Sequence, residues 1–529
     1  MQPDLLLTGG HVYTMDPARP RASSLAVREG RVVALDEDAA ALRQPATRVI
    51  DLGGRAVLPG FVDAHVHFGS FSLAREQVDL DQAPTLEAGL DRIRRAADEL
   101  TPGAWVRGRG WDRNRWGRLP AAADLDAATG DRSAALSSHD GHSVWLNSAA
   151  FSYCGINDDT QPPAGGVIER DDNGHPSGVL FENAQDLVRR KIPEPTDDQL
   201  REAISRALPL AAAAGLTGIH NLEDSRSLRA FQALEQSGDL TLRVYHGIPR
   251  GKLAEARDLG LRTGVGGELV RIGPVKLFSD GALGSRTAYM LEPYENRTDG
   301  YRGVPTLDPT ELAELMQTAA DAELDIAVHA IGDAAVRRVL DAYESTLERC
   351  APLRVRMLRI EHAQLTHPSD IGRFAQLGVI ASMQPIHAIA DWRTANEHWG
   401  ARARHGYAWR ELLDSGAHVA FGTDAPVERI EPLLNVHAAV TRVDADGEPA
   451  GGWYPEQRVS LEEAVQAYTS GSAYAERASH QRGTLMPGKD ADLVVLAADP
   501  FELPADALRE LTIDLTVVGG RIVYEGGAR

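Results

Sequence analysis

The sequence predicts an α/β protein whose main part is a TIM-type (β/α)8 barrel. From about residue 200 onward, short apolar runs typical of buried strands alternate with amphipathic helical stretches. With one earlier apolar run that ends in a His-x-His pair, this pattern gives eight strands and favours a barrel. An open doubly wound sheet is the alternative, disfavoured because no Gly-x-Gly-x-x-Gly follows an early strand. The predicted strands are 56–67, 218–222, 242–246, 270–278, 326–329, 357–362, 379–384 and 419–424.

Both ends of the chain predict a second, smaller β domain. Short runs of alternating apolar and polar residues, separated by Gly turns, fill residues 1–56. The same pattern recurs near the C-terminus. The piece Thr8-Gly9-Gly10-His11-Val12 resembles Val518-Gly519-Gly520-Arg521-Ile522. Neither end is long enough for a sandwich by itself. We therefore expect residues 1–56 and 480–529 to form one composite β-sandwich domain, with the barrel, 57–479, inserted between them.

Residues 70–200 interrupt the strand–helix alternation. They contain a helical stretch at 86–100, and Pro162-Pro163 and Gly165-Gly166 mark loops. We interpret 70–200 as a large insertion after the first barrel strand, where it could cover the site as a lid or a substrate-binding wall. In the regular part of the chain, amphipathic stretches predict helices over 309–322 and 333–349.

Composition excludes several classes of protein. Lys and Arg number 55 against 76 Asp and Glu, and the net charge of −21 argues against binding to nucleic acid or an anionic membrane. The two cysteines, Cys154 and Cys350, are too few for a cysteine-based zinc site and do not indicate a disulfide framework. No stretch approaches the ~18 apolar residues of a membrane span. Since no signal-peptide pattern opens the sequence, we expect a cytoplasmic location.

Residue types that ligate metals fall at the C-terminal ends of the predicted strands, where barrel active sites lie. The two histidines of the first strand are two positions apart, so their side chains point to the same side. Each residue also has an ordinary explanation, as an exposed edge histidine, a hydrogen-bonded core histidine, a salt-bridged lysine or a helix N-cap. Their shared position at one end of a barrel favours a metal site. The residues are His65, His67, Lys276, His329, His362 and Asp424.

Four further segments have a distinctive sequence. They are Gly110-Trp111-Asp112 with Trp116, Asp140-Gly141-His142-Ser143-Val144-Trp145, Lys276-Leu277-Phe278-Ser279-Asp280-Gly281 with Gly284-Ser285-Arg286-Thr287, and Glu361-His362-Ala363-Gln364. With the strand-end residues, they make the chain resemble the amidohydrolase superfamily, which carries His-x-His on strand one, Lys on four, His on five and six, and Asp on eight. Within it, the sequence is similar to the YtcJ-like branch, which includes N-substituted formamide deformylases. The similarity spans nearly the whole chain.

The resemblance implies a metal-dependent hydrolase with one or two divalent ions per chain. His65, His67 and Asp424 would hold one ion and His329 and His362 a second. Lys276 would bridge the two ions as a carbamate formed with CO2. Nitrogen and oxygen donors fit zinc, which we expect, and manganese, iron and nickel are alternatives. A site with a single ion uses the same ligands.

The implied reaction is hydrolysis of an amide bond in a small N-acyl or N-formyl compound. A metal-bound hydroxide would attack the carbonyl, and Asp424 would shuttle its proton to the leaving nitrogen. Hydrolysis of a lactone, carbamate, ester or cyclic amidine on the same site is an alternative, and a non-catalytic binding protein is a third. The expected partner is the small-molecule substrate, without nucleic acid or membrane, and the resemblance implies a homodimer.

Other residues are candidates for contacts with the substrate. His142 and His139 are candidate catalytic residues, and with Arg286 they could stabilise an oxyanion. A tight loop with a local His–Asp hydrogen bond explains the two histidines equally well. Trp111, like Trp116 and Trp145, could wall an apolar pocket or form the core of the insertion. Arg286 and Asp280 complete the predicted substrate-binding set with Trp111.

Overall fold

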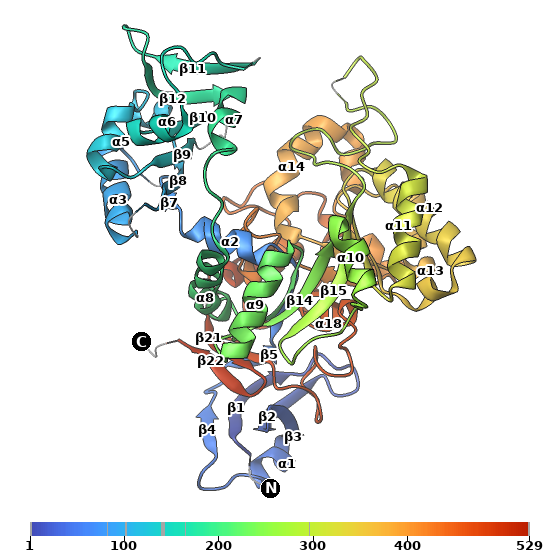
Figure 1. Cartoon of the computed structure of the whole chain (residues 1–529). Helices are drawn as coiled ribbons and strands as arrows, with labels where there is room; N and C mark the ends of the chain where they lie inside the picture. The colour runs from blue at the N-terminus through green and yellow to red at the C-terminus, as the bar shows by residue number, and fades with distance from the viewer. Residues whose placement is uncertain are drawn as a thin grey trace. The chain divides into compact units, whose positions relative to one another are not determined.

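The structure is a computed structural model that describes residues 3–81, 83–100, 103–138, 143–163, 165–295 and 297–526. The chain divides into two compact units. One unit combines Met1–Phe71 with Ile204–Arg529, and the other is Ser72–Ala203. The first unit contains the barrel and a sheet built from both ends of the chain (Figure 1).

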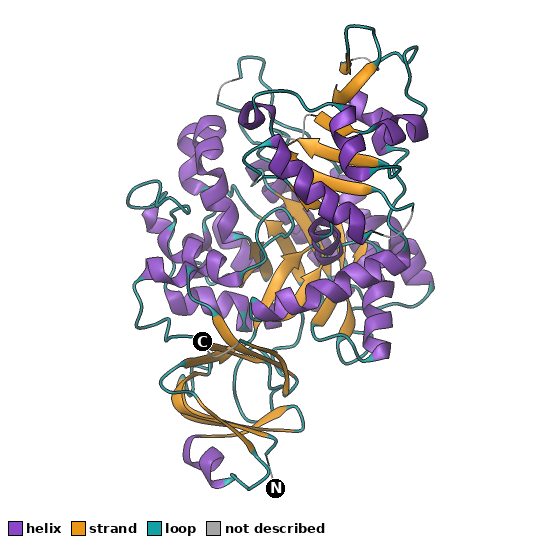
Figure 2. Cartoon of the chain, turned by 90° about the vertical axis from the view of Figure 1, so that its left-hand side faces the viewer, coloured by secondary structure: helices purple, strands orange, loops and turns teal. Residues whose placement is uncertain are grey.

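In the part of the chain that the structure describes, eight parallel strands form a nearly closed barrel, which confirms the predicted fold class. Helices surround these strands (Figure 2). The backbone N–H of Asp424 donates to the carbonyl of His65 at 2.7 Å, and that of His67 donates to Ala425 at 2.9 Å. These bonds connect the end of the last strand to the end of the first. In barrel order, the strands are β6 (Phe61–Val66), β13 (Leu216–Asn221), β14 (Arg243–Pro249), β15 (Val270–Phe278), β16 (Ile326–Ala330), β17 (Leu358–His362), β18 (Val379–Met383) and β19 (Val419–Phe421).

The two helices predicted in the first unit begin at the predicted residues. The side chain of Asp308 accepts a hydrogen bond from the backbone N–H of Thr310 at 2.8 Å and so caps α11 (Pro309–Asp321). The predicted helix over 333–349 is α12 (Asp333–Arg349). The other helices of this unit are α1 (Asp36–Ala41), α2 (Phe68–Arg75, shared with the second unit), α9 (Ser225–Ser237), α10 (Leu253–Asp258), α13 (Pro368–Leu377), α14 (Pro385–Trp399), α15 (Trp409–Asp414), α16 (Pro432–Thr441), α17 (Leu461–Tyr468) and α18 (Ser470–Ala475). Helix α8 (Asp197–Ala213) leads from the second unit back into the first.

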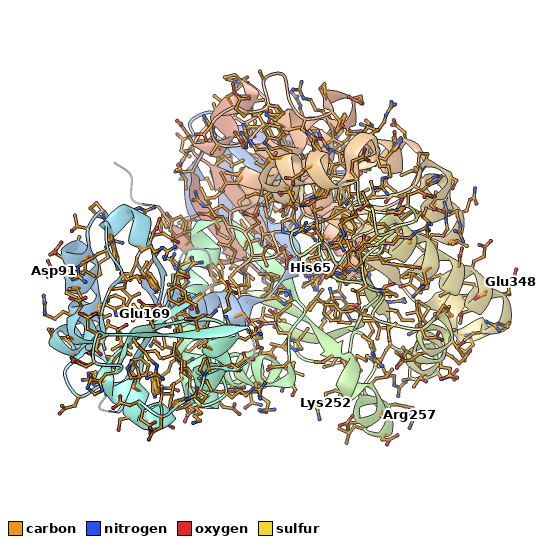
Figure 3. All side chains as sticks on the ribbon, turned by 90° about the horizontal axis from the view of Figure 1, so that it is seen from above. His65, Asp91, Glu169, Lys252, Arg257 and Glu348 are labelled. Carbon is orange, nitrogen blue, oxygen red and sulfur yellow. The ribbon has the colours of Figure 1, made fainter. Side chains whose placement is uncertain are left out.

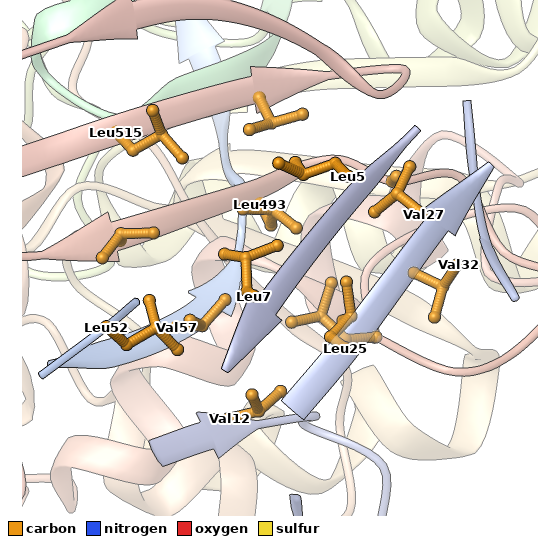
Figure 4. Close-up of a cluster of buried hydrophobic side chains, with 14 of the residues drawn as sticks. Leu5, Leu7, Val12, Leu25, Val27, Val32, Leu52, Val57, Leu493 and Leu515 are labelled. Carbon is orange, nitrogen blue, oxygen red and sulfur yellow. The ribbon is translucent and has the colours of Figure 1, made fainter. Parts of the chain in front are cut away.

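A second sheet of the first unit contains strands from both ends of the chain. Its order is β22-β21-β20-β5-β1-β2-β3, and β4 pairs with β1. Apolar side chains from both termini, among them Leu5, Leu25, Leu493 and Leu515, pack into one cluster (Figure 4). Burial of this shared apolar surface stabilises the association of the termini. The strands are β1 (Leu5–Tyr13), β2 (Arg21–Arg28), β3 (Arg31–Leu35), β4 (Arg48–Asp51), β5 (Ala56–Pro59), β20 (Leu493–Leu496), β21 (Ile513–Val518) and β22 (Arg521–Glu525).

The predicted first barrel strand is two strands in two sheets, so the prediction of one strand over 56–67 was wrong in its extent. Strand β5 pairs with β1 and β20 in the terminal sheet, whereas β6 pairs with β13 in the barrel. The chain passes between the sheets at Gly60, where a Cβ atom would lie 2.2 Å from the side chain of Thr217. Because both strands are buried, the apolar run continues across the change of sheet.

The second unit contains a mixed sheet with the order β11-β12-β10-β9-β8-β7. The predicted helix over 86–100 is α3 (Leu86–Glu99), capped by Thr85, whose hydroxyl accepts from the N–H of Ala88. Among the described residues, no helix combines the length and the apolar composition that a membrane span requires. The remaining elements are β7 (Val78–Asp79), β8 (Val106–Trp111), β9 (Ala134–Ser138), β10 (Ser143–Leu146), β11 (Gly166–Arg170), β12 (Pro176–Glu182), α4 (Arg113–Trp116), α5 (Ala122–Thr129), α6 (Ser148–Cys154) and α7 (Asp186–Arg189).

Candidate metal centre

Three of the predicted ligands converge on one point at the C-terminal end of the barrel. The Nε2 atom of His67 lies 3.2 Å from Oδ1 of Asp424, and Nε2 of His65 lies 3.6 Å from the same oxygen. One ligand atom from each residue lies within 4.8 Å of the others. His65 is fully buried, whereas Glu348 and Arg257 project from the surface of the first unit (Figure 3). The cluster can therefore present three donor atoms to one cation.

A carboxylate behind His65 fixes the orientation of its ring. Oε2 of Glu361 lies 2.6 Å from Nδ1 of His65, and because an ionised carboxylate only accepts, Nδ1–H is the donor. The lone pair of the neutral ring is then on Nε2. That Nε2 and Oδ1 of Asp424 are buried and have no hydrogen-bond partner among the described residues. Buried polar atoms are normally satisfied, so two unsatisfied donor atoms facing each other fit a metal ion.

A buried arginine stabilises the negative charge of Glu361. Nε of Arg359 donates to Oε1 of Glu361 at 2.8 Å, and neither side chain is exposed. Arg359 also donates to Nδ1 of His220 at 2.8 Å and to the carbonyl of Ala64 at 2.7 Å. Burial alone would raise the pKa of Glu361, but Arg359 and His65 outweigh it and hold the pKa well below its usual range. Glu361 therefore remains a carboxylate behind the ligand ring.

His329 and His362 also offer one free ring nitrogen each. Nδ1 of His362 donates to Oε1 of Gln384 at 2.8 Å, which leaves the lone pair on Nε2. Nε2 of His329 donates to the carbonyl of Gly281 at 2.9 Å, which leaves the lone pair on Nδ1. The ring of His362 lies 4.7 Å, centroid to centroid, from the rings of both His329 and His65. Burial lowers the pKa of His329 to about 3 and that of His65 to about 4, so both rings are neutral near pH 7, as metal ligation requires.

Lys276 is a buried amine that forms no ion pair with the described residues. It is 4% exposed, and among the described residues neither a hydrogen bond nor an ion pair holds its Nζ, which lies 5.1 Å from the ring centroid of Phe278. Burial lowers the pKa of Lys276 to about 8, although the nearby carboxylates of Glu361 and Asp424 oppose this shift. A buried ammonium without a close partner is costly. A substantial fraction of the amine is therefore neutral at mildly alkaline pH.

The backbone around Asp424 is held tightly against the His-x-His strand. Oδ1 of Asp63 accepts from the backbone N–H groups of His65 and Thr423, both at 3.0 Å, and its Oδ2 accepts from the hydroxyl of Thr423 at 2.5 Å. A Cβ at Gly422 would lie 2.5 Å from the backbone nitrogen of His65. Asp424 itself has a φ of 59°, and His362 has a φ of 72°. Non-glycine residues in this region are rare and concentrate at functional sites.

The remaining predicted residues lie in different surroundings. Asp280 is buried, and its carboxylate accepts from the backbone N–H groups of Tyr289, Ile331 and Gly332 at 2.8–3.0 Å, so both its oxygens are already engaged. Arg286 is exposed and, within the described residues, makes no side-chain hydrogen bond. The predicted roles of these two residues in substrate binding stay predictions.

Trp111 lies in the hydrophobic core of the second unit. It is 2% exposed, its indole N–H donates to the carbonyl of Leu136 at 2.8 Å, and its ring packs edge-on against Trp145. These contacts agree with the alternative that Trp111 forms part of the core of the insertion. Its role in substrate binding stays a prediction. His139 and His142 lie outside the described residues, so their catalytic roles stay predictions as well.

One histidine of the site escaped the sequence analysis. His387, in the first turn of α14, has its Nε2 3.7 Å from Oδ2 of Asp424. With His362 and Asp424 it forms a second group of potential ligand atoms within 4.8 Å of one another. A signal was present, because His387 follows the seventh strand by only four residues and so lies at the same end of the barrel.

Comparisons with known proteins extend over nearly the whole chain. A protein family described as "Amidohydrolase family" matches residues 48–524 of the chain. The chain is 33% identical to "Protein LONG AFTER FAR-RED 3" of Arabidopsis thaliana, over 98% of this chain and 91% of that protein. It is 32% identical to "Putative amidohydrolase YtcJ" of Bacillus subtilis, over 98% of each chain. It is 29% identical to "N-substituted formamide deformylase" of Arthrobacter pascens, over 99% and 98%. An uncharacterized metal-dependent hydrolase from Pyrococcus furiosus has a similar structure, with a TM-score of 0.79 and 30% identity over 94% of this chain and 100% of that one.

Proposed function

Since this chain belongs to the amidohydrolase family, we propose that it cleaves the amide bond of a small N-acyl or N-formyl compound. At the coarser level, it is a metal-dependent hydrolase of the amidohydrolase type, an enzyme class that acts on carbon–nitrogen bonds. The name of the Arthrobacter pascens relative supports the finer proposal. The observation that carries it is the convergence of His65, His67 and Asp424, since Nε2 of His65 and Oδ1 of Asp424 are buried without a hydrogen-bond partner among the described residues.

We assign the ligands of the metal to two groups. His65, His67 and Asp424 would hold one divalent ion, because their donor atoms lie within 4.8 Å of one another. His329 and His362 would hold a second, through the ring nitrogens that their hydrogen bonds leave free. Zinc suits this set of imidazole and carboxylate donors. When bound, the ion supplies a Lewis acid that polarises a carbonyl and acidifies water.

Lys276 would join the two groups as a carbamate formed with CO2. Its lowered pKa supports this assignment, because CO2 reacts with a neutral amine and not with an ammonium. The modification would also replace a buried positive charge, which repels cations, with an anionic group that has two oxygen donors. Burial of an ammonium that forms no hydrogen bond or ion pair with the described residues is otherwise costly.

Asp424 is the group best placed to move a proton. Burial alone would raise the pKa of Asp424, but the surrounding histidines, His65 first among them, hold it well below its usual range, so the side chain is an ionised base. In the proposed reaction, Asp424 accepts a proton from the attacking water. It then returns the proton to the amide nitrogen as the carbon–nitrogen bond breaks, so that the amine leaves neutral and the acyl carbon keeps the water oxygen.

The proposal can be tested with zinc-loaded protein and a panel of N-formyl amines, N-acyl amines, lactones and carbamates. We expect the highest kcat/KM for an N-formyl or N-acyl amine, and loss of that activity in the Asp424→Asn variant. Formation of amine and acid in equal amounts would identify the broken bond. Turnover of lactones or carbamates alone would contradict the proposed bond, while leaving the metal-dependent hydrolase assignment intact.

A further inference from the structure

His362 and His387 lie side by side at the metal centre and both approach Asp424. Their rings are stacked, with centroids 6.1 Å apart and planes 16° apart. His362 ends the sixth barrel strand, and His387 lies on α14 after the seventh. Both side chains are buried, with exposed fractions of 5% and 6%. By position alone, either ring could be a metal ligand.

Hydrogen bonding at Nδ1 distinguishes the two rings. Nδ1 of His362 faces Oε1 of Gln384 at 2.8 Å, so it carries the hydrogen and leaves a lone pair on Nε2. Nδ1 of His387 faces the amide nitrogen of Gln364 at 3.3 Å. An amide N–H only donates, so Nδ1 of His387 is the acceptor and its hydrogen is on Nε2. His362 therefore offers a lone pair to the centre, whereas His387 offers an N–H.

The N–H of His387 faces the second oxygen of Asp424. Oδ1 lies on the side of His65 and His67, and Oδ2 lies 3.7 Å from Nε2 of His387. This distance exceeds a hydrogen bond, and among the described residues Nε2 of His387 has no hydrogen-bond partner. Hydrogen bonds that act in catalysis are often long in the free enzyme and tighten in the complex with substrate. The two oxygens of Asp424 thus face different groups, with Nε2 of His65 and Nε2 of His67 near Oδ1 and the N–H of His387 near Oδ2.

The backbone of His387 is rigidly placed. The helix begins at Pro385, and the N–H of Ile386 donates to the side chain of Asn435 on α16 at 3.0 Å. The N–H of His387 donates to the carbonyl of Gln384 at 3.1 Å. Since Gln384 also orients His362, one residue at the end of β18 contributes to the placement of both rings. A hydrogen bond can fix the orientation of a carboxylate only if its donor is itself held in place.

We propose that His387 donates a hydrogen bond to Oδ2 of Asp424 when the metal is bound, is not itself a ligand, and thereby directs Oδ1 toward His65 and His67. His387 is then a positioning residue, because it acts through Asp424. It would hold Oδ1 toward His65 and His67, and Oδ2 would keep a second lone pair with which it can accept a proton. The kinetic part of this inference rests on the proposed function, whereas the position of the carboxylate can be measured without substrate.

Two substitutions at one position separate the roles of the two ring nitrogens. In His387→Asn, the shorter amide can replace Nδ1 and keep the contact with Gln364, but it cannot reach Asp424. In His387→Gln, the longer amide can place an N–H near the position of Nε2. His437→Asn is the matched control. His437 is 3% exposed and its Nε2 lies 3.7 Å from Oδ1 of Asp506, but it is on α16 and touches no predicted ligand.

The first readout is metal binding, measured as zinc content per chain and as the visible spectrum of the cobalt(II)-loaded protein. We expect all three variants to bind as much metal as the wild type. The cobalt spectrum of His387→Asn should change, because a carboxylate released at Oδ2 can bind through both oxygens, and the spectra of His387→Gln and His437→Asn should not. The second readout is kinetic. We expect kcat to fall about 10- to 100-fold in His387→Asn with KM nearly unchanged, and to recover in His387→Gln.

Two results would overturn the inference. Loss of metal from both His387 variants would make His387 a ligand. A wild-type cobalt spectrum in His387→Asn would show that the residue does not control the carboxylate, whatever happens to kcat. If the wild-type protein turns over no amide, the proposed function fails, but the cobalt spectra still decide the role of His387.

Discussion

Buried polar and charged groups of the first unit fall into two sets that differ in how completely their hydrogen bonds are satisfied. Where the barrel meets the terminal sheet, Arg243 donates from Nε and Nη2 to the two oxygens of Asp492 at 2.7 and 3.1 Å, and each side chain is 6% exposed. At the other end of the barrel strands, Nε2 of His65 and Oδ1 of Asp424 are buried as deeply but have no hydrogen-bond partner among the described residues.

The difference shows what each set contributes. In a buried ion pair with satisfied hydrogen bonds, the attraction between the partners offsets much of the cost of removing the charges from water. Removal of one partner leaves an uncompensated buried charge. Unsatisfied buried atoms are costly unless a ligand completes them, and such groups concentrate at functional sites. We therefore expect substitutions in the first set to reduce stability and substitutions in the second to reduce metal binding and activity.

The largest effect should come from Asp424→Asn, in the unsatisfied set. The amide keeps the shape of the side chain but is neither an anionic ligand nor a base, so kcat should fall by at least about 1,000-fold. The thermal unfolding midpoint should remain near that of the wild type, because no satisfied ion pair is lost. Wild-type kcat in this variant would rule out Asp424 as the proton shuttle.

Arg243→Ala should have the opposite profile. It leaves Asp492 buried without its partner, so the free energy of unfolding should fall by about 3–5 kcal/mol, as measured by denaturant titration. Arg48→Ala is the control, since the pair of Arg48 and Glu525 is more than half exposed and should contribute only about 0–1 kcal/mol. Equal destabilisation by the two variants would contradict the distinction between buried and exposed pairs.

Glu361→Gln tests whether the carboxylate behind His65 increases the affinity of this ligand for the metal. The amide oxygen can still accept from Nδ1 of His65, but the negative charge is gone, so metal affinity should fall about 10- to 100-fold. A competition titration with a chromogenic chelator measures this directly. An unchanged affinity would mean that Glu361 serves only as a partner for Arg359.

The smallest effect concerns pH and Lys276. Below a pKa of about 8 the amine becomes an ammonium, so the neutral form that reacts with CO2 should decrease roughly fivefold between pH 8 and pH 7. Carbamate formation should therefore rise with pH through this range. Carbon-13 NMR of metal-loaded protein in labelled bicarbonate measures it, with Lys276→Met as the blank. A carbamate signal that is the same in both proteins would exclude Lys276 as its source.

The barrel could be predicted because most of its strands are short apolar runs that alternate with amphipathic helical stretches, with several polar residues at or just after the strand ends. His329 and His362 occur at such ends, and the structure has strands over Ile326–Ala330 and Leu358–His362. The switch between two sheets at Gly60 could not be predicted, because Ala56–Pro59 and Phe61–Val66 are buried in different sheets and read as one run. Hydrophobicity reports burial but does not show which sheet buries a strand.

The residues that support the ligands were harder to find for a different reason. Arg359 and Glu361 alternate with apolar residues on β17, a pattern that normally indicates one exposed face of a strand. In this barrel both charged side chains point inward and neutralise each other. His387 lies on a helix four residues after its strand, so polar residues at strand ends do not include it. The partners of Arg359 and Glu361 are recognised only when the side chains opposite them are known.

The most direct test of the central claim is the metal content per chain of protein purified without chelators and then incubated with zinc. The two ligand groups and a bridging Lys276 predict about two equivalents in the wild type, with loss of zinc in Asp424→Asn. A wild-type chain that binds no zinc, or an Asp424→Asn variant that keeps the full complement, would show that the unsatisfied atoms of His65 and Asp424 are not metal ligands.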